Sequence, residues 1–143
     1  MRQVPPPLPP PPPELAPIVL VAEDDDELRR LVARRLRRIG CDVLEARTGV
    51  QLTELVIEHG VPPVAERPVS LVVSDVRMPG RSGLDVLRLL RRAGVDVPVL
   101  LLTAFGSDEL AAEAARLGAV VCDKPIDLDD LATMARELIR WCG

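Results

Sequence analysis

Five short apolar segments, separated by longer stretches with a helical repeat, constrain the fold of this chain more than any other feature. The segments are IVLVA (18–22), CDVLEA (41–46), VSLVVS (69–74), VPVLLLT (97–103) and GAVVC (118–122). All except CDVLEA are too continuously apolar for a strand that is buried on one face only. The segments therefore predict the strands of a parallel sheet that is covered on both faces.

The intervening stretches carry apolar residues at three- and four-residue steps, the spacing that places side chains on one face of an α-helix. The residues are Leu28, Leu31, Val32, Leu36 and Ile39, then Leu84, Leu87 and Leu90, and in a last helix at about 127–141 Leu131, Met134, Ala135 and Leu138. Asp25 or Asp26 suits the N-cap of the first helix, and Gly40 and Gly118 suit helix ends. The alternation implies an α/β fold with right-handed crossovers.

A chain of 143 residues has room for one domain and a tail. Residues 1–17 hold nine of the fifteen prolines and little that could enter a core. We expect this segment to be an extended, disordered polyproline tail that acts as a spacer rather than as a polyproline ligand. The folded domain then spans residues 18–143. Within it, HGVPPVAERP (59–68) is too polar and too rich in proline to continue a helix and predicts a surface loop.

Composition and charge exclude several classes of function. One Phe, one Trp and no Tyr leave little to stack on nucleobases, and a net charge of -4 argues against nucleic-acid binding. Because the chain shows neither a membrane span nor a secretory signal, we expect a cytoplasmic protein with no membrane partner. The chain has one His, and its three cysteines, Cys41, Cys122 and Cys142, are far apart in the sequence. A zinc site is therefore poorly supported, and we expect reduced, partly buried thiols.

Polar side chains interrupt the pattern at corresponding positions, near the ends of four predicted strands. They are Glu23 and Asp24 after the first strand, Asp75 after the third, Thr103 at the end of the fourth and Lys124 just after the fifth. The carboxyl ends of parallel strands share one edge of the sheet, where a crevice opens as the strand order reverses. Each residue alone suits a cap or a turn, but that interpretation does not explain why all five fall on one edge.

Such a cluster has a definite chemistry. Three carboxylates repel one another and have raised pKa values unless a cation compensates them. Oxygen ligands without His or Cys suit Mg²⁺, which keeps several waters and accepts an anionic ligand such as phosphate. The Lys124 ammonium and the Thr103 hydroxyl suit the remaining oxygens of a phosphoryl group. Asp75 is then a metal ligand, a nucleophile or both.

Four segments carry a resemblance to a known family. VLVAEDDDELRRLV, LVVSDVRMPGRSGLDVL, VPVLLLTAFGS and GAVVCDKPIDLDDL look like the signature segments of the receiver domain of bacterial two-component response regulators. The resemblance covers about residues 18–141, and the four motifs occur in the family's order. It implies a flavodoxin-like (βα)5 fold, doubly wound, with strand order 2-1-3-4-5.

The resemblance also implies roles for individual residues. Asp75 would be the phosphoacceptor, with Thr103 and Lys124 on the phosphoryl oxygens. Mg²⁺ would be held by Asp24, by Asp75, by Glu23 through a water and by the backbone carbonyl of Arg77. The phosphoryl donor would be a phosphohistidine of a sensor histidine kinase or phosphotransfer protein. Such a domain is a signalling switch that catalyses only its own phosphorylation and dephosphorylation.

Further features of the family map onto other positions. Lys124–Pro125 would be a cis peptide, and Gly83 matches the glycine that opens the third helix. Arg77 and Phe105 would flank the site and tune the lifetime of the phosphoryl group. In one position the chain departs from the family, since Val121 stands where a switching Tyr or Phe is usual. Valine has no comparable pair of buried and exposed states, which puts the usual coupling in doubt.

Two competing functions follow. A degenerate receiver that binds proteins without phosphorylation is favoured by Val121 and opposed by the intact site residues. A phosphohydrolase of the haloacid dehalogenase type needs a second Asp where Arg77 stands. The chain ends near the last predicted helix, so we expect a stand-alone receiver that signals to an unknown protein target, unless the sequence is a fragment.

The first helix is rich in arginine. Its residues Arg29, Arg30, Arg34, Arg35, Arg37 and Arg38 predict a basic outer face. A solvated face paired with nearby acids is the simpler interpretation, and kinase docking, which uses this helix in the family, is the alternative.

Overall fold

The computed structural model describes residues 16–59 and 68–141. It contains β1 (Ile18–Ala22), α1 (Asp26–Arg38), β2 (Asp42–Ala46), α2 (Gly49–His59), β3 (Val69–Asp75), α3 (Gly83–Arg92), β4 (Val99–Thr103), α4 (Asp108–Arg116), β5 (Val120–Asp123) and α5 (Leu128–Trp141). All four strand pairs are parallel, and the strand order is β2-β1-β3-β4-β5. The predicted flavodoxin-like fold is confirmed.

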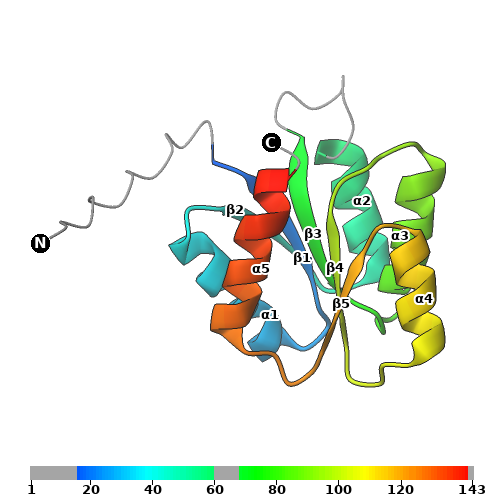
Figure 1. Ribbon diagram of the computed structural model, residues 1–143. Coiled ribbons are helices and arrows are strands. Elements are labelled where there is room, and N and C mark those ends of the chain that lie inside the picture. The colour runs from blue at the N-terminus through cyan, green and yellow to red at the C-terminus, as the bar shows by residue number, and fades with distance from the viewer. Residues whose placement is uncertain (1–15, 60–67, 142–143) are drawn as a thin grey trace, which may run out of the picture.

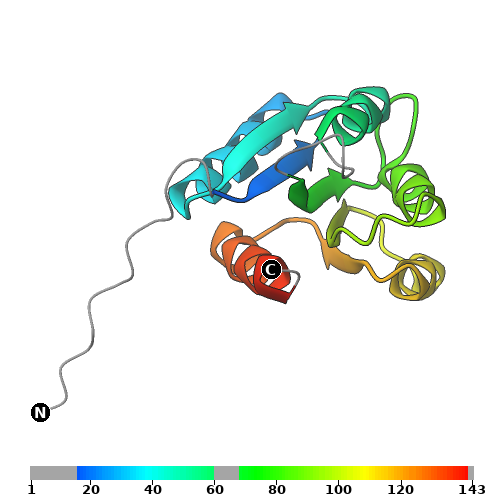
Figure 2. The same cartoon turned by 90° about the horizontal axis from the view of Figure 1, so that it is seen from above.

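The sheet separates two layers of helices (Figure 1), with α1 and α5 on one face and α2, α3 and α4 on the other. Figure 2 shows α5 and α4 on opposite sides of β5. Alternate residues of β1 enter the two cores: Val19 and Val21 face α1, whereas Leu20 faces α2. This period-two alternation is why a central strand must be apolar at every position.

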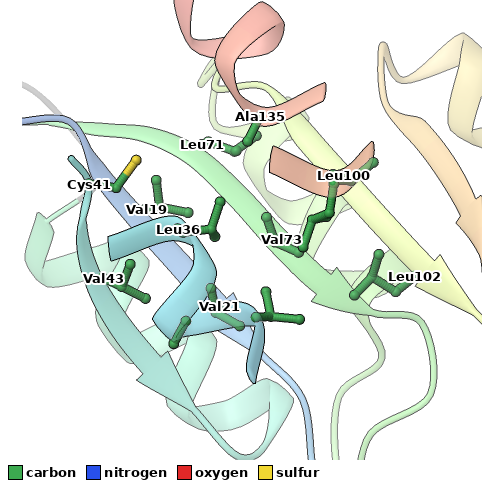
Figure 3. Packing of buried hydrophobic residues seen from close by; sticks show 13 residues of the cluster. Val19, Val21, Leu36, Cys41, Val43, Leu71, Val73, Leu100, Leu102 and Ala135 are labelled. Atoms are coloured by element: carbon green, nitrogen blue, oxygen red, sulfur yellow. The ribbon is translucent and has the colours of Figure 1, made fainter. Parts of the chain in front are cut away.

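The core beneath α1 and α5 consists almost entirely of aliphatic side chains (Figure 3). Leu36 of α1 and Ala135 of α5 join Val73 and Leu100 of the sheet, and each of the four is at most 1% exposed. Such burial stabilises by roughly 1.5–3 kcal/mol for each large aliphatic side chain. The core therefore needs no aromatic residue.

Helix ends follow the predicted signals. Asp25 is the N-cap of α1, and its side chain accepts hydrogen bonds from the backbone N–H groups of Glu27 and Leu28. Gly40 and Gly118 follow α1 and α4 with φ angles of 98° and 69°, which non-glycine residues rarely adopt. Both glycines relieve backbone strain where the chain leaves a helix.

Two predictions of burial were wrong. The run 118–122 was expected to be buried on both faces, but β5 is an edge strand, and Val120 is 39% exposed. Leu31 was assigned to the apolar face of α1, yet it is 40% exposed and lies beside the exposed Arg30. An apolar side chain at a helical step is buried only if a neighbouring element covers that step.

Three further predictions lie outside the described residues in whole or in large part. They concern the tail at 1–17, the loop at 59–68 and Cys142. Of the other two cysteines, Cys41 is buried and Cys122 is half-buried, and both are free thiols. The described part of the chain contains no helix that is long and apolar enough to cross a membrane.

Candidate functional site

The reversal of strand order places the candidate site between β1 and β3. From β1 the chain crosses to β2 on one side, and from β3 it crosses to β4 on the other. The loops after β1 and β3 thus diverge and leave a crevice at the carboxyl edge of the sheet. Glu23 directly follows β1, and Asp75 is the last residue of β3.

Backbone hydrogen bonds continue the sheet into this edge and align the site residues. The Glu23 N–H donates to the Ala46 carbonyl at 3.0 Å, and the Lys124 N–H donates to the Thr103 carbonyl at 2.8 Å. Glu23, Asp75 and Thr103 are 1%, 6% and 4% exposed, whereas Asp24 is exposed. The structure therefore sets buried polar groups beside an exposed carboxylate.

Side-chain contacts join these residues into one cluster. Lys124 Nζ lies 2.6 Å from Glu23 Oε1 and 3.2 Å from Asp75 Oδ2. Carboxylate oxygens of Glu23, Asp24 and Asp75 lie within 4.8 Å of one another. The Lys124 ammonium group contacts two buried acids from opposite sides of the crevice. It therefore links the ends of β1 and β3 and places a positive charge between them.

Contacts within the cluster shift the pKa values of Glu23 and Lys124. Burial and the neighbouring Asp75 carboxyl group raise the pKa of Glu23 to about 7, although Lys124 acts in the opposite direction. Burial lowers the pKa of Lys124, but its hydrogen bond to Glu23 and its attraction to Asp75 outweigh this and raise it above the usual value. Lys124 is therefore a fixed positive charge near neutral pH, whereas Glu23 titrates there.

The residues at the crevice fit a divalent cation. Among the described residues, Glu23 Oε2 is a buried side-chain oxygen without a hydrogen-bond partner. An orphaned buried carboxylate oxygen is costly unless a cation or water satisfies it. Three carboxylates with no His or Cys among them are the donors that Mg²⁺ prefers.

Gly83, the first residue of α3, packs directly behind Asp75. A Cβ atom at this position would lie 2.3 Å from the Asp75 carbonyl oxygen. Ser82 and Asp85 form a capping box at the same helix end, with the Asp85 N–H donating to Ser82 Oγ at 3.0 Å. The missing side chain of Gly83 thus lets α3 begin against the end of β3.

The outer wall of the crevice is formed by Arg77 and Phe105. The Arg77 guanidinium carbon lies 4.8 Å from the centre of the Phe105 ring, a cation–π distance. The Phe105 N–H donates to Thr103 Oγ1 at 3.1 Å, and the ring is 68% exposed. The Thr103 hydroxyl hydrogen remains available to another acceptor. Sequence reasoning placed both residues beside the site but did not anticipate their stacking.

Lys124 and Pro125 are joined by the cis peptide that the resemblance implied. Val121 lies opposite Leu101 of β4 and is half-buried against the core of α2, α3 and α4. A short aliphatic side chain therefore stands at the position where the family usually has a switching Tyr or Phe.

One residue at this edge was placed wrongly by sequence reasoning. Arg29 was assigned to the basic outer face of α1, but it is only 6% exposed and its side chain reaches the Glu23 carbonyl oxygen at 3.1 Å. Its spacing from Val32 and Leu36, three and seven residues on, is that of the buried face and was the available signal. Arg35 and Arg37 are likewise paired, with Asp129 and Glu45.

A sequence profile described as the response regulator receiver domain matches residues 19–136. The chain belongs to this family. The receiver domain of a Francisella response regulator, 1452, covers 89% of the chain with 26% identity and a TM-score of 0.78, and 99% of that domain is matched. The signal receiver domain of a LuxO repressor protein of Vibrio parahaemolyticus also covers 89%, with 27% identity, a TM-score of 0.78 and 92% of that domain matched.

The curated relatives are longer proteins. The transcriptional regulatory protein FixJ of Bradyrhizobium diazoefficiens is 43% identical over 70 residues, which make up 48% of this chain and 34% of FixJ. The matched segment therefore spans about a third of that regulator. Receiver domains are signalling domains rather than classical enzymes; they work with histidine kinases or phosphotransfer proteins and generally bind Mg²⁺ at an acidic pocket.

Proposed function

We propose that this receiver accepts a phosphoryl group from a phosphohistidine onto Asp75 and signals through protein contacts. The observation that carries the proposal is the Lys124 ammonium group, 3.2 Å from the Asp75 carboxylate and inside a cluster of three acids. A cation that ends among carboxylates at the crevice can neutralise the oxygens of an incoming phosphoryl group.

We propose Mg²⁺ as the cofactor. Asp24, Asp75 and the Arg77 carbonyl would be its ligands, and Glu23 would hold one of its waters. When bound, the metal would neutralise charge on the phosphoryl oxygens and orient the group for in-line attack. The orphaned Glu23 Oε2 atom and the oxygen-only donor set support this assignment.

The chemistry is a displacement at phosphorus. A carboxylate oxygen of Asp75 attacks, an O–P bond forms, and the P–N bond to the imidazole of the donor breaks with its electron pair returning to nitrogen. Lys124 holds one phosphoryl oxygen, and Thr103 donates its hydroxyl hydrogen to another. Water later hydrolyses the acyl phosphate, and the exposed Phe105 ring, held by Arg77, shields it and lengthens its lifetime.

Intact-mass measurement after incubation with Mg²⁺ and acetyl phosphate tests this function. We expect one added phosphoryl group in the wild type and none in Asp75→Asn. The matched control is Asp123→Asn, because Asp123 is an exposed acid at the end of β5, on the far side of β4 from Asp75. A wild type without added mass, or an Asp75→Asn variant that still gains it, contradicts the proposal.

The degenerate receiver is the second candidate, and Val121 is the observation that favours it. We propose instead that phosphorylation acts through Thr103 and the N–H of Phe105, which are already hydrogen-bonded at 3.1 Å. Amide exchange with and without beryllofluoride measures this route. Protection that changes at residues 104–110 supports it, and an unchanged profile in a protein that binds the analogue favours the degenerate receiver.

We propose that the donor kinase docks on α1. Arg30, Arg34 and Arg38 are exposed on this helix around the exposed Leu31 and offer a basic surface with an apolar centre. Charge reversal of Arg34 and Arg38 should slow phosphotransfer from the kinase while leaving reaction with acetyl phosphate unchanged. Reversal of Arg92 and Arg116, exposed on α3 and α4, is the control. A cytoplasmic, bacterial protein without nucleic-acid or membrane partners completes the proposal.

A further inference from the structure

Arg29 is a buried cation that the proposed chemistry does not use. Its side chain is 7% exposed, a burial that a guanidinium group tolerates only when its charge and its donors are satisfied. Three oxygens surround it. Nη1 lies 2.7 Å from Asp26 Oδ1 and 3.1 Å from the Glu23 carbonyl oxygen, and Nε lies 3.2 Å from Glu45 Oε1.

These contacts immobilise the backbone of Glu23. Its N–H group donates to the Ala46 carbonyl at 3.0 Å, and its carbonyl accepts from Arg29. Both backbone groups of this residue are therefore fixed, one by β2 and the other by α1. Asp24, the next residue, leaves from a fixed peptide, and the Asp25 cap then starts α1. Arg29 therefore fixes the backbone from which the Glu23 and Asp24 carboxylates extend.

The acids around Arg29 do not depend on it alone. Asp26 also pairs with Arg47 at 2.8 Å, and Glu45 also pairs with Arg37 at 3.3 Å. Neutralisation of these acids therefore does not require Arg29, because Arg47 and Arg37 already pair with them. The contact that Arg29 alone makes among these three arginines is the one to the Glu23 carbonyl.

We infer that Arg29 is a positioning residue that holds Glu23 and Asp24 in place for the divalent cation. The inference rests on the proposed function of the crevice. Groups that orient metal ligands from behind typically change metal affinity by about 10–100-fold when they are removed. Replacement of Arg29 should therefore weaken Mg²⁺ binding although Arg29 itself does not touch the ion.

Calorimetric titration with Mg²⁺ tests the inference in the wild type and its variants. The titration is done far below the melting temperature. We expect Arg29→Met to lose roughly tenfold in affinity. Arg37→Met is the matched control, because it removes another arginine of α1 from Glu45 but leaves the Glu23 contact, and it should keep wild-type affinity. A thermal melt of each variant separates loss of stability from loss of binding.

Each outcome has a single meaning. A wild type that binds no Mg²⁺ contradicts the proposed function itself, whereas a wild type and an Arg29→Met variant that bind equally overturn only the inference. An equal loss in Arg37→Met also overturns it, since the effect would then be general to the helix. If Arg29→Met does not fold, Arg29→Lys decides: it keeps the charge without the planar fork, and affinity equal to wild type would contradict the inference.

Discussion

The two flanks of the crevice are built differently. On the β1 side, Glu23 and Arg29 are almost fully buried and paired, with backbone and side-chain contacts to β2 and α1. On the other side, in the loop after β4 and the first turn of α4, all residues from Ala104 to Glu109 are exposed, and Ala114 is the buried residue that α4 contributes. The acidic side is held in place by buried contacts, whereas the opposite side makes few buried contacts that would oppose its movement.

This contrast shows how the chain can depart from the family at Val121 and still hold the acids and the lysine of the crevice in contact. Glu23, Asp75 and Thr103 lie on or beside β1, β3 and β4, where both faces of the sheet are covered. Lys124 follows β5, but its ammonium group is held by Glu23 and Asp75. The departure from the family lies on β5, an edge strand that is half-exposed. We therefore expect Val121 to affect how phosphorylation changes the surface of the domain rather than how the crevice is assembled.

Truncation of the core should show the largest difference between the flanks. Leu20→Ala, in β1, should lower the free energy of unfolding by about 2–5 kcal/mol, because Leu20 is fully buried and the cavity cannot close. Leu117→Ala, after α4, should cost less than about 1.5 kcal/mol, since this side chain is half-buried. Urea unfolding measures both. Equal losses would show that the flanks are packed alike.

Removal of the shared cation should slow the chemistry more than it affects folding. Lys124→Met should reduce the rate of phosphorylation by acetyl phosphate by roughly 10²–10³-fold, the usual effect of losing one preorganised charge at a reacting oxygen. Arg116→Met on the exposed face of α4 is the control and should react at the wild-type rate. Intact mass over time gives the rates, and a Lys124→Met rate within threefold of wild type would contradict the role of the ammonium group.

Mg²⁺ affinity should fall as the pH is lowered from 8 to 6. Glu23 has a pKa of about 7 in the folded protein, so its carboxylate is mostly protonated at the lower pH, and a protonated acid holds the hydrated ion less well. The expected loss is about tenfold, and Glu23→Gln should flatten the profile. Calorimetry in matched buffers measures it.

The same shift has the opposite sign for stability without metal. The folded-state pKa of Glu23 is raised above its ordinary value of 4.5, so folding is favoured below that value and the benefit is lost as the pH rises through about 7. Urea midpoints of the metal-free wild type should therefore fall relative to Glu23→Gln over this interval. A midpoint difference that is constant between pH 4 and pH 8 would show that Glu23 titrates normally.

The smallest effect is expected at the exposed wall. Phe105→Ala should change the free energy of unfolding by less than about 0.5 kcal/mol, because the ring is 68% exposed. It should nevertheless shorten the lifetime of the phosphoryl group severalfold, since water then reaches Asp75 more easily. Decay of the added mass after removal of the phosphodonor measures the lifetime, with Leu31→Ala, also exposed, as control. An unchanged lifetime would remove Phe105 from the shielding role.

The apolar pattern alone was sufficient for the strands and the two helical layers, because periodic burial is a local property. The strand order was predicted from the family resemblance. Sequence reasoning also identified the five polar residues at the strand ends, whose grouping follows from the parallel sheet. It failed for Leu31 and Val120, whose spacing is typical of covered positions although both are exposed. It failed for Arg29 because this residue was assigned by its charge, although its spacing is that of the buried face of α1.

Those three residues show what only tertiary structure decided. Whether Leu31 and Val120 are covered depends on which elements pack beside α1 and β5, and no local pattern contains that information. Arg29 was counted with five other arginines by its charge, yet its burial depends on Glu45 and Asp26 meeting it from β2 and from its own helix. A charged side chain can be buried only where other groups satisfy it, so the partners that allow Arg29 to be buried became visible only when the chain was folded.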